Sequence, residues 1–411
     1  MMSATPLAPP PVSPLARYRL LSPNAAVKVS PLCLSTMSFG NAWKDQMGDR
    51  SQREVEALLD YFYSQVSTQA GLQPRYYRNF VDTSNNYQFQ ESEQWVGDWM
   101  RKRGVRDQMV IATKYTTNFV AGPAHPPIMA NYAGNGTKSL VQSVESSLKN
   151  LQTSYIDVWD YSTSIAELMQ SLNHLVAMGK VLYLGASNTP AWVVSKANEY
   201  ARHHGLRQFS VYQGLWSANC RDLERDVVPM CKSEGMGITP WGAPSKGKFK
   251  LAERRRYEDG LHSAFNDPEV KICEAMEDLA FQLDTTLTCI ALSYIIHKAP
   301  YVFPVIAARG ISQLKEYIQA LVVKLDPENI KAVDSAIPFD LGFPHSLLWK
   351  NDIPETPQSV SFLEMAGTFD FVPEPAPITA PMARTDEYNR GGFAARKAPN
   401  LRFSKPRGRM Q

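Results

Sequence analysis

Short apolar segments alternate with longer amphipathic segments from Leu32 to Ala336, and this alternation constrains the fold more than any other feature of the chain. Eight of the apolar segments have the length and nearly continuous apolar character of parallel strands buried on both faces. They are residues 32–39, 79–82, 110–114, 155–158, 181–186, 209–213, 237–241 and 302–306. Eight such strands with helices between them predict an α/β fold of the (β/α)8 type, a TIM barrel.

The amphipathic segments between the strands predict the helices of that barrel. The clearest are residues 90–103, 138–151, 165–178, 190–204 and 223–234. Pro190 suits a first helical turn, and Gly179 and Gly205 suit positions just past a helix end. A doubly wound sheet is the alternative, but no GxGxxG motif follows any of the strands.

The ends of the chain differ in composition from this region. We expect a flexible, irregular N-terminal segment over residues 1–30, a barrel over 31–338, and a largely irregular or disordered extension over 339–411. Between Arg384 and Arg409 the chain has eight Lys or Arg residues against two acids, although its net charge is only +3. The few apolar residues there favour a disordered basic tail. A nucleic-acid-binding arm is the alternative, but no nucleic-acid-reading motif accompanies it.

The cysteines and the N-terminus indicate the compartment. Five cysteines, with no CxxC pair, favour a reducing environment over disulfides or a zinc site. The histidines show no metal-ligand spacing, and no stretch is apolar for long enough to span a membrane. The N-terminus lacks the apolar core of a signal peptide. We therefore expect a cytoplasmic protein with no metal, membrane or nucleic-acid partner.

Polar residues stand where the predicted strands end, and in a TIM barrel these ends form the active face. Asp82 and Lys114 end two successive strands, and Tyr87 follows the first of them. A free tyrosine has a pKa of about 10, too high for efficient proton transfer at neutral pH. A neighbouring ammonium favours the phenolate, and a carboxylate holds that ammonium in place. The set suits protonation of a carbonyl oxygen as hydride reaches the carbon, although Asp82 could also cap a turn and Lys114 could be a solvated strand end.

The same stretches resemble the aldo-keto reductase family. The matching residues are 82–87 with Ser92, Glu93 and Gly97, then 112–114, 179–180, 185–188, 211–214 and 240–242. Residues 181–201 and 223–230 are similar to its fungal aryl-alcohol dehydrogenase branch, which includes reductases of the norsolorinic acid type. The resemblance implies that Tyr87 is the general acid, that Lys114 activates it, and that Asp82 orients Lys114.

The resemblance also implies a site for NADP. Ser187, Asn188 and Gln213 would hydrogen-bond the nicotinamide carboxamide, and Trp241 would stack on the ring unless it is a core residue. Arg309 would bind the adenosine 2′-phosphate, because a guanidinium suits that group. The substrate would be a small carbonyl compound, aromatic or derived from a polyketide. The loop of residues 115–136 is a candidate wall of its pocket.

The chain departs from the family pattern at three places. The family's catalytic histidine ends the fourth strand, but here the sequence around Val158 is shorter and lacks this histidine. Residues 66–78 look like an insertion, and two misplaced splice boundaries would explain both changes. Ala307 and Ala308 stand where the family has glycines and Tyr317 where it has an asparagine, which predicts weaker cofactor binding.

We therefore expect an NADPH-dependent aldo-keto reductase that converts an aldehyde or ketone to an alcohol. The missing histidine leaves open a catalytically weak barrel that binds NADP(H) and serves as an interaction module. A truncated fourth strand also leaves open a barrel that does not close.

Overall fold

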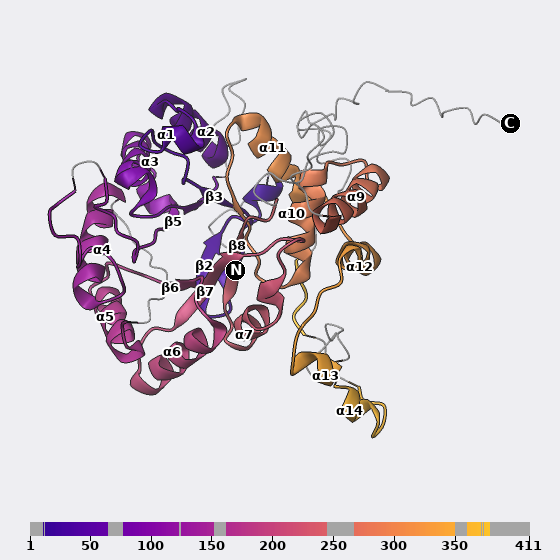
Figure 1. Cartoon of the computed structure of the whole chain (residues 1–411). Coiled ribbons are helices and arrows are strands. Elements are labelled where there is room, and N and C mark those ends of the chain that lie inside the picture. The colour runs from indigo at the N-terminus through magenta and orange to yellow at the C-terminus, as the bar shows by residue number, and fades with distance from the viewer. Residues whose placement is uncertain are drawn as a thin grey trace, which may run out of the picture.

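The computed structural model describes residues 11, 13–64, 77–122, 125–151, 162–244, 267–349, 360–370, 372 and 374–378. Within these ranges, seven parallel strands form one strongly curled sheet (Figure 1). In sheet order they are β5 (Val110–Ala112), β4 (Phe80–Asp82), β3 (Cys33–Ser35), β9 (Val305–Ile306), β8 (Gly237–Trp241), β7 (Phe209–Leu215) and β6 (Leu184–Ser187). The predicted α/β barrel is confirmed.

The pairing of the first and last strands gives the sheet its barrel character. Leu34 of β3 pairs with Val81 on one side and with Ile306 on the other, so the chain's last barrel strand returns beside its first. The described edges of the sheet are β5 and β6. The strand predicted at residues 155–158 belongs between them in sequence and lies outside the described residues.

Helices surround the sheet, as the amphipathic segments predict (Figure 1). Those of the barrel are α2 (Gln52–Ser64), α3 (Glu91–Arg103), α4 (Thr137–Leu151), α5 (Ile165–Ala177), α6 (Ala191–His204), α7 (Val227–Ser233), α9 (Asp267–Gln282), α10 (Leu287–Lys298), α11 (Ile311–Gln319) and α12 (Pro327–Ala336). Gly104 and Gly205 follow α3 and α6 with φ angles of 64° and 67°, a backbone conformation that glycine adopts readily. Short elements complete the barrel: α1 (Lys44–Met47) and the 3-10 turns η2 (Tyr87–Gln90), η3 (Arg106–Gln108), η4 (Asp222–Glu224) and η6 (Ala320–Val322).

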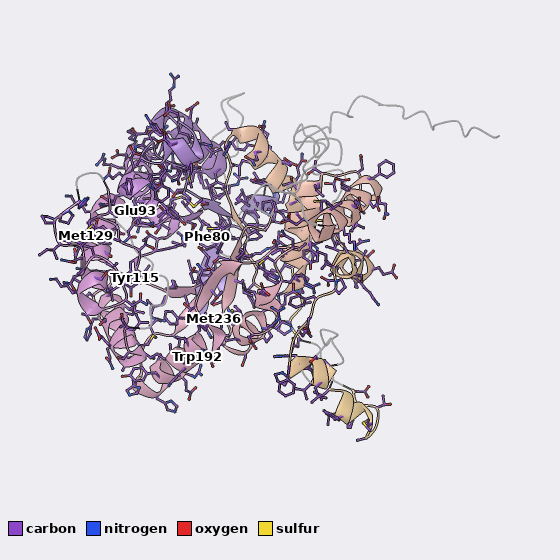
Figure 2. All side chains as sticks on the ribbon, viewed as in Figure 1. Phe80, Glu93, Tyr115, Met129, Trp192 and Met236 are labelled. Atoms are coloured by element: carbon purple, nitrogen blue, oxygen red, sulfur yellow. The ribbon has the colours of Figure 1, made fainter. Side chains whose placement is uncertain are left out.

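The side chains divide into an inner and an outer set (Figure 2). Phe80 lies within the sheet and is 3 % exposed, whereas Trp192 lies on the helical layer and is 59 % exposed. Of the helices in the described ranges, none is by itself long and apolar enough to cross a membrane, and only the bent pair α9–α10 meets that test by length and composition.

Part of the N-terminal segment that the sequence predicts to be irregular, residues 19–29, forms an ordered hairpin, and residues 1–10 and 12 lie outside the described residues. After a 3-10 turn, η1 (Pro14–Ala16), strands β1 (Arg19–Ser22) and β2 (Ala25–Val29) pair antiparallel. Leu21, Ala25 and Val29 are buried against the starts of the barrel strands, with Phe80 and Phe303. The abundant Pro and Ala upstream of this segment conceal its apolar residues when composition is averaged over 30 positions.

The C-terminal extension contains two short helices, α13 (His345–Trp349) and α14 (Ser361–Glu364), which lie apart from the barrel in Figure 1. Arg225 donates from Nε to the Asp340 carbonyl at 2.9 Å, and Lys232 pairs with Glu374 at 3.0 Å, so this segment is tied to the region of α7. The basic residues 384–409 lie outside the described residues.

Candidate active site

Asp82, Lys114 and Tyr87 meet at the carboxyl ends of β4 and β5. Asp82 ends β4 and pairs in register with Ala112, so the lysine two residues later reaches back over the carboxylate. Lys114 Nζ donates to Asp82 Oδ1 at 2.6 Å and to the Thr83 carbonyl at 2.6 Å. Tyr87 Oη lies 3.5 Å from the same nitrogen. Asp82 is buried and Tyr87 is half-buried.

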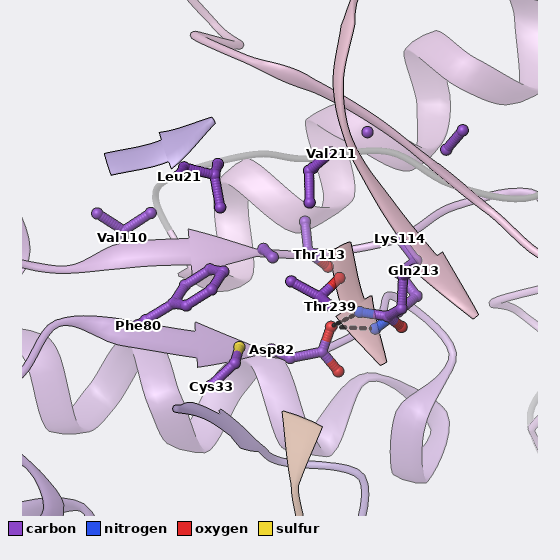
Figure 3. Close-up of a pocket in the computed structure, with 13 residues that line it drawn as sticks. Leu21, Cys33, Phe80, Asp82, Val110, Thr113, Lys114, Val211, Gln213 and Thr239 are labelled. Atoms are coloured by element: carbon purple, nitrogen blue, oxygen red, sulfur yellow. Dashed lines mark hydrogen bonds and ion pairs between the residues drawn. The ribbon is translucent and has the colours of Figure 1, made fainter. Parts of the chain in front are cut away.

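Gln213 joins this group from the other side of the barrel. Its Nε2 donates to Asp82 Oδ1 at 2.9 Å, so one carboxylate oxygen accepts from both Gln213 and Lys114 (Figure 3). These three residues and Thr239 form the polar end of a cavity inside the sheet. Residues of the hairpin and of the strand interiors form its apolar part: Leu21, Cys33, Phe80, Val110, Ala112, Ala186 and Val211.

Ser187 and Asn188 are positioned against Gln213 by strand pairing. Ser187 ends β6 in register with Gln213, and the Asn188 amide donates to the Gln213 carbonyl at 3.0 Å. Asn188 has a φ of 46°, a left-handed conformation that asparagine tolerates better than most residues. The three residues therefore present a hydroxyl and two amides at neighbouring strand ends, the groups that a planar carboxamide requires.

Trp241 and Arg309 lie on the same edge of the sheet but do not line the cavity. Trp241 ends β8, is half-buried, and packs against an apolar cluster that includes Val305, its neighbour on β9. Arg309 follows β9 with an exposed side chain, and its backbone amide donates to Gln313 Oε1 at 2.9 Å. Gln313 in turn donates to Tyr317 Oη at 2.6 Å, so Tyr317 braces this loop.

A second cation, Arg50, lies within electrostatic reach of Arg309. Arg50 is largely buried, and burial lowers the pKa of its guanidinium, with the charge of Arg309 adding to the effect. Two guanidinium groups near each other form a site where a dianion would be stabilised.

Aromatic residues beside Tyr87 were not found from the sequence. The ring of Trp43 lies edge-on to Tyr87, with centroids 6.3 Å apart, and edge-on to Phe89, with centroids 6.0 Å apart. Trp43 lies in the loop after β3, and Phe89 lies in η2, which follows β4. Their positions after predicted strands could have indicated that both lie on the active face. In the loop predicted to form a substrate wall, Phe119 packs edge-on to Tyr132 at 5.7 Å.

A buried carboxyl lies next to Thr113, the residue before Lys114. Glu93 is completely buried on α3, and Thr113 Oγ1 donates to its Oε1 at 2.5 Å. Asn150 Nδ2 donates to Oε2 at 3.2 Å. Burial raises the pKa of Glu93, because the ionised form is poorly solvated there.

Two predicted features fall outside the described residues: the shortened fourth strand near Val158, and all but the last two positions of the apparent insertion at 66–78. Within the described ranges, no group of three or more His, Cys, Asp or Glu side chains is placed to hold a metal ion.

Comparison with known proteins adds the family. The model of the aldo/keto reductase family matches residues 31–338. A norsolorinic acid reductase B of Dothistroma septosporum is 46% identical over 378 residues, which cover 88% of this chain and 93% of that protein. A norsolorinic acid reductase of Aspergillus flavus is 49% identical over 351 residues, covering 84% and 87% of the two chains. A putative aryl-alcohol dehydrogenase of Saccharomyces cerevisiae is 45% identical over 355 residues, covering 83% and 92%.

Proposed function

Because the chain belongs to the aldo/keto reductase family, a family of oxidoreductases that act on carbonyl and alcohol groups, we propose that it reduces an aldehyde or ketone with NADPH and that Tyr87 donates the proton. The observation that carries this proposal is the position of Lys114 Nζ, 2.6 Å from the Asp82 carboxylate and 3.5 Å from the Tyr87 hydroxyl. An ammonium so placed stabilises the phenolate that remains after proton transfer.

The residues at the strand ends fit a nicotinamide cofactor. The Ser187 hydroxyl and the amides of Asn188 and Gln213 would hold the carboxamide and so select the face of the ring. When bound, the cofactor supplies a hydride to the carbonyl carbon. Tyr87 then gives its proton to the carbonyl oxygen as the C=O electron pair moves onto that oxygen, and Lys114 compensates the charge left on the phenol.

The charges near β9 favour NADPH over NADH. Arg309 is exposed there and Arg50 is close enough for the two charges to affect each other. A 2′-phosphate would bind between them, and its absence from NADH would leave two guanidinium groups facing one another. Trp241 would lie against the nicotinamide ring at the end of β8.

The substrate class we favour is an aromatic or polyketide-derived carbonyl compound of fungal secondary metabolism. Two observations support it: the names of the related proteins, and the edge-on rings of Trp43 and Phe89 beside Tyr87. Five free cysteines support a cytoplasmic location.

The test is NADPH oxidation by the purified protein with a panel of aromatic aldehydes. Tyr87→Phe removes the proton donor and should lower kcat by about 10²–10⁴-fold while NADPH still binds. Tyr200→Phe removes a hydroxyl that only accepts a hydrogen bond from Gln170 between α5 and α6, and should leave kcat unchanged. An equally active Tyr87→Phe enzyme would exclude Tyr87 as the proton donor.

A second candidate is a barrel that binds NADP(H) without efficient turnover. The absence of the family's histidine near Val158 favours it. NADPH binding by the wild-type protein, with no oxidation across the panel, would support this candidate over the first.

A further inference from the structure

Three consecutive residues directly after Tyr87 have left-handed backbone conformations. Their φ angles are 52° for Gln88, 50° for Phe89 and 79° for Gln90, and none is a glycine. In this region the Cβ atom is crowded by the neighbouring carbonyl oxygen, so each residue is disfavoured unless its surroundings hold it. The contacts of these three side chains show what holds them.

Gln88 is tied to the loop after β3, residues 36–51, which we call the Trp43 loop. Its side chain is buried, and its Oε1 accepts from the Trp43 amide at 2.7 Å while its Nε2 donates to the Met37 carbonyl at 3.1 Å. Gly40 packs against it so closely that a Cβ there would lie 2.6 Å from Gln88 Cβ. Both hydrogen-bonding ends of one amide are therefore used to fix this loop.

Phe89 and Gln90 are tied to the loop after β5, residues 115–136, which we call the Phe119 loop. Gln90 Nε2 donates to the Phe119 carbonyl at 3.3 Å, and a Cβ on Gly122 would lie 3.4 Å from the Phe89 side chain. On its other side, Gln90 Oε1 accepts from Ser146 at 2.8 Å, which anchors it to α4.

We propose that residues 88–90 act as a clasp that couples the Trp43 loop and the Phe119 loop to Tyr87, with Gln88 as its positioning residue. The proposal rests on the proposed function in one respect, because what the clasp positions is the proposed proton donor. The two loops are far apart in sequence and flank the active face. The three strained residues bind both loops and follow Tyr87 directly in the chain, so they link both loops to Tyr87.

The physical reason for coupling is that contacts with both loops stabilise the left-handed backbone conformation of residues 88–90. If the Trp43 loop leaves, Gln88 loses both hydrogen bonds and the backbone can relax from the left-handed region. Relaxation there changes the direction of the chain that leads into Gln90, and so weakens its bond to the Phe119 loop. It also moves the residue immediately before it, which is Tyr87.

Two substitutions test the coupling from opposite ends. Gln88→Leu keeps the side chain's size and removes its hydrogen bonds to the Trp43 loop. Gln90→Leu does the same to the Phe119 loop, and the Gln90 side chain forms its hydrogen bonds with that loop and with α4. Gln170→Leu is the matched control, because it removes a glutamine hydrogen bond between α5 and α6.

Hydrogen–deuterium exchange followed by mass spectrometry should report both loops. In each clasp variant, amides of both loops should exchange about tenfold faster, while α6 and α7 stay unchanged. Faster exchange confined to the loop that each substitution touches would refute the coupling. This measurement needs no turnover, so it stands even if the proposed reductase activity is absent.

Kinetics then test the positioning of Tyr87. For Gln88→Leu we expect kcat with an aromatic aldehyde to fall about tenfold at saturating NADPH. Saturation removes any effect that the loosened Trp43 loop has on cofactor affinity through Arg50, which lies in that loop. Wild-type kcat despite loosened loops would overturn the positioning role. If Gln88→Leu does not fold, Gln90→Leu gives the same two readouts.

Discussion

Gln213 donates a hydrogen bond from Nε2 to Oδ1 of Asp82 across 2.9 Å. The oxygen that receives it is the one that also binds Lys114. The residue proposed to hold the cofactor's amide is thus linked, through one carboxylate, to the lysine beside the proposed proton donor. Binding of a carboxamide to Gln213 would compete for the same amide hydrogens and so alter the field at Lys114.

The first prediction concerns this carboxylate. Asp82→Asn preserves its size but removes the charge that opposes the Lys114 ammonium, and we expect kcat to fall about 10²-fold or more. Because Asp82 and Gln213 are in contact, the effects of Asp82→Asn and Gln213→Ala on kcat/KM should not add. If the two effects on kcat/KM are additive in the double variant, the contact between Asp82 and Gln213 does not contribute to catalysis. Asp98→Asn, at an exposed pair with Arg101, is the control.

The second prediction is a pH dependence of stability that originates at Glu93. Burial raises its pKa in the folded protein above the ordinary value of 4.5. The folded state therefore prefers the protonated acid, and wild-type stability is lost as pH rises from that value through the folded pKa. Glu93→Gln resembles the protonated form, so its free energy of unfolding should exceed that of the wild type at neutral pH.

Urea unfolding at a series of pH values measures the difference in free energy of unfolding between Glu93→Gln and the wild type. The advantage of Glu93→Gln should shrink as pH falls toward the ordinary pKa. Glu54→Gln gives the opposite case, since hydrogen bonds from Ser51 lower the pKa of Glu54. Its stability should drop relative to the wild type above the ordinary pKa. A pH-independent difference for Glu93→Gln would show that the pKa of this carboxyl does not change on folding.

The third prediction concerns a buried ion cluster beneath the loop after β7. Lys298 is 9% exposed at its side chain and lies 3.2 Å from Glu224 and 2.9 Å from Asp334. Lys298→Met leaves these acids with less compensating charge, and should cost about 3–5 kcal/mol of unfolding free energy. Lys232→Met breaks the more exposed pair with Glu374 and should cost less than about 1 kcal/mol. Equal costs in thermal and chemical unfolding would contradict the difference in burial.

The fourth prediction concerns the contact between α3 and α4. A Cβ on Gly97 would lie 1.9 Å from the Asn150 carbonyl oxygen, a backbone atom that no rotamer change can move. Alanine is normally favoured over glycine inside a helix. Here Gly97→Ala should instead destabilise the protein by about 1–3 kcal/mol, because the helices must separate. At Gly136 a Cβ would have nothing closer than 3.9 Å, so Gly136→Ala should stay within about 0.5 kcal/mol of the wild type. Calorimetry of the two variants would decide the matter.

The strand ends were predictable because each combines a short apolar run with a polar residue directly after it. Residues 237–241 were expected as a strand and are β8. Asp82, Lys114 and Gln213 were expected on one face, and Asp82 accepts hydrogen bonds from both of the others. The observed strands β3, β5 and β9 are shorter than expected, since neighbouring strands pair over only part of each apolar run.

The features that were missed depend on contacts between distant residues. Leu21 packs against Phe80 and Phe303, which no local pattern around residue 21 reveals. The left-handed run at Gln88 lacks the glycines that usually indicate positive φ, because distant hydrogen bonds rather than local preference hold it. The cluster around Lys298 joins residues from η4, α10 and α12, and a sequence shows only that its members are charged.

The N-terminal hairpin gives the barrel a floor. Gly237 approaches it so closely that a Cβ would lie 2.2 Å from the Leu21 carbonyl oxygen, and Leu21 itself forms part of the cavity's apolar end. Because the hairpin covers the base of the barrel, we expect the cofactor and the carbonyl compound to enter and leave at the active face. A cofactor seated against Ser187 and Gln213 would have to arrive before a carbonyl compound placed over Tyr87 and depart after the alcohol. If the cofactor binds as proposed, we therefore expect an ordered exchange of ligands, to which the hairpin at residues 19–29 contributes together with the proposed catalytic residues.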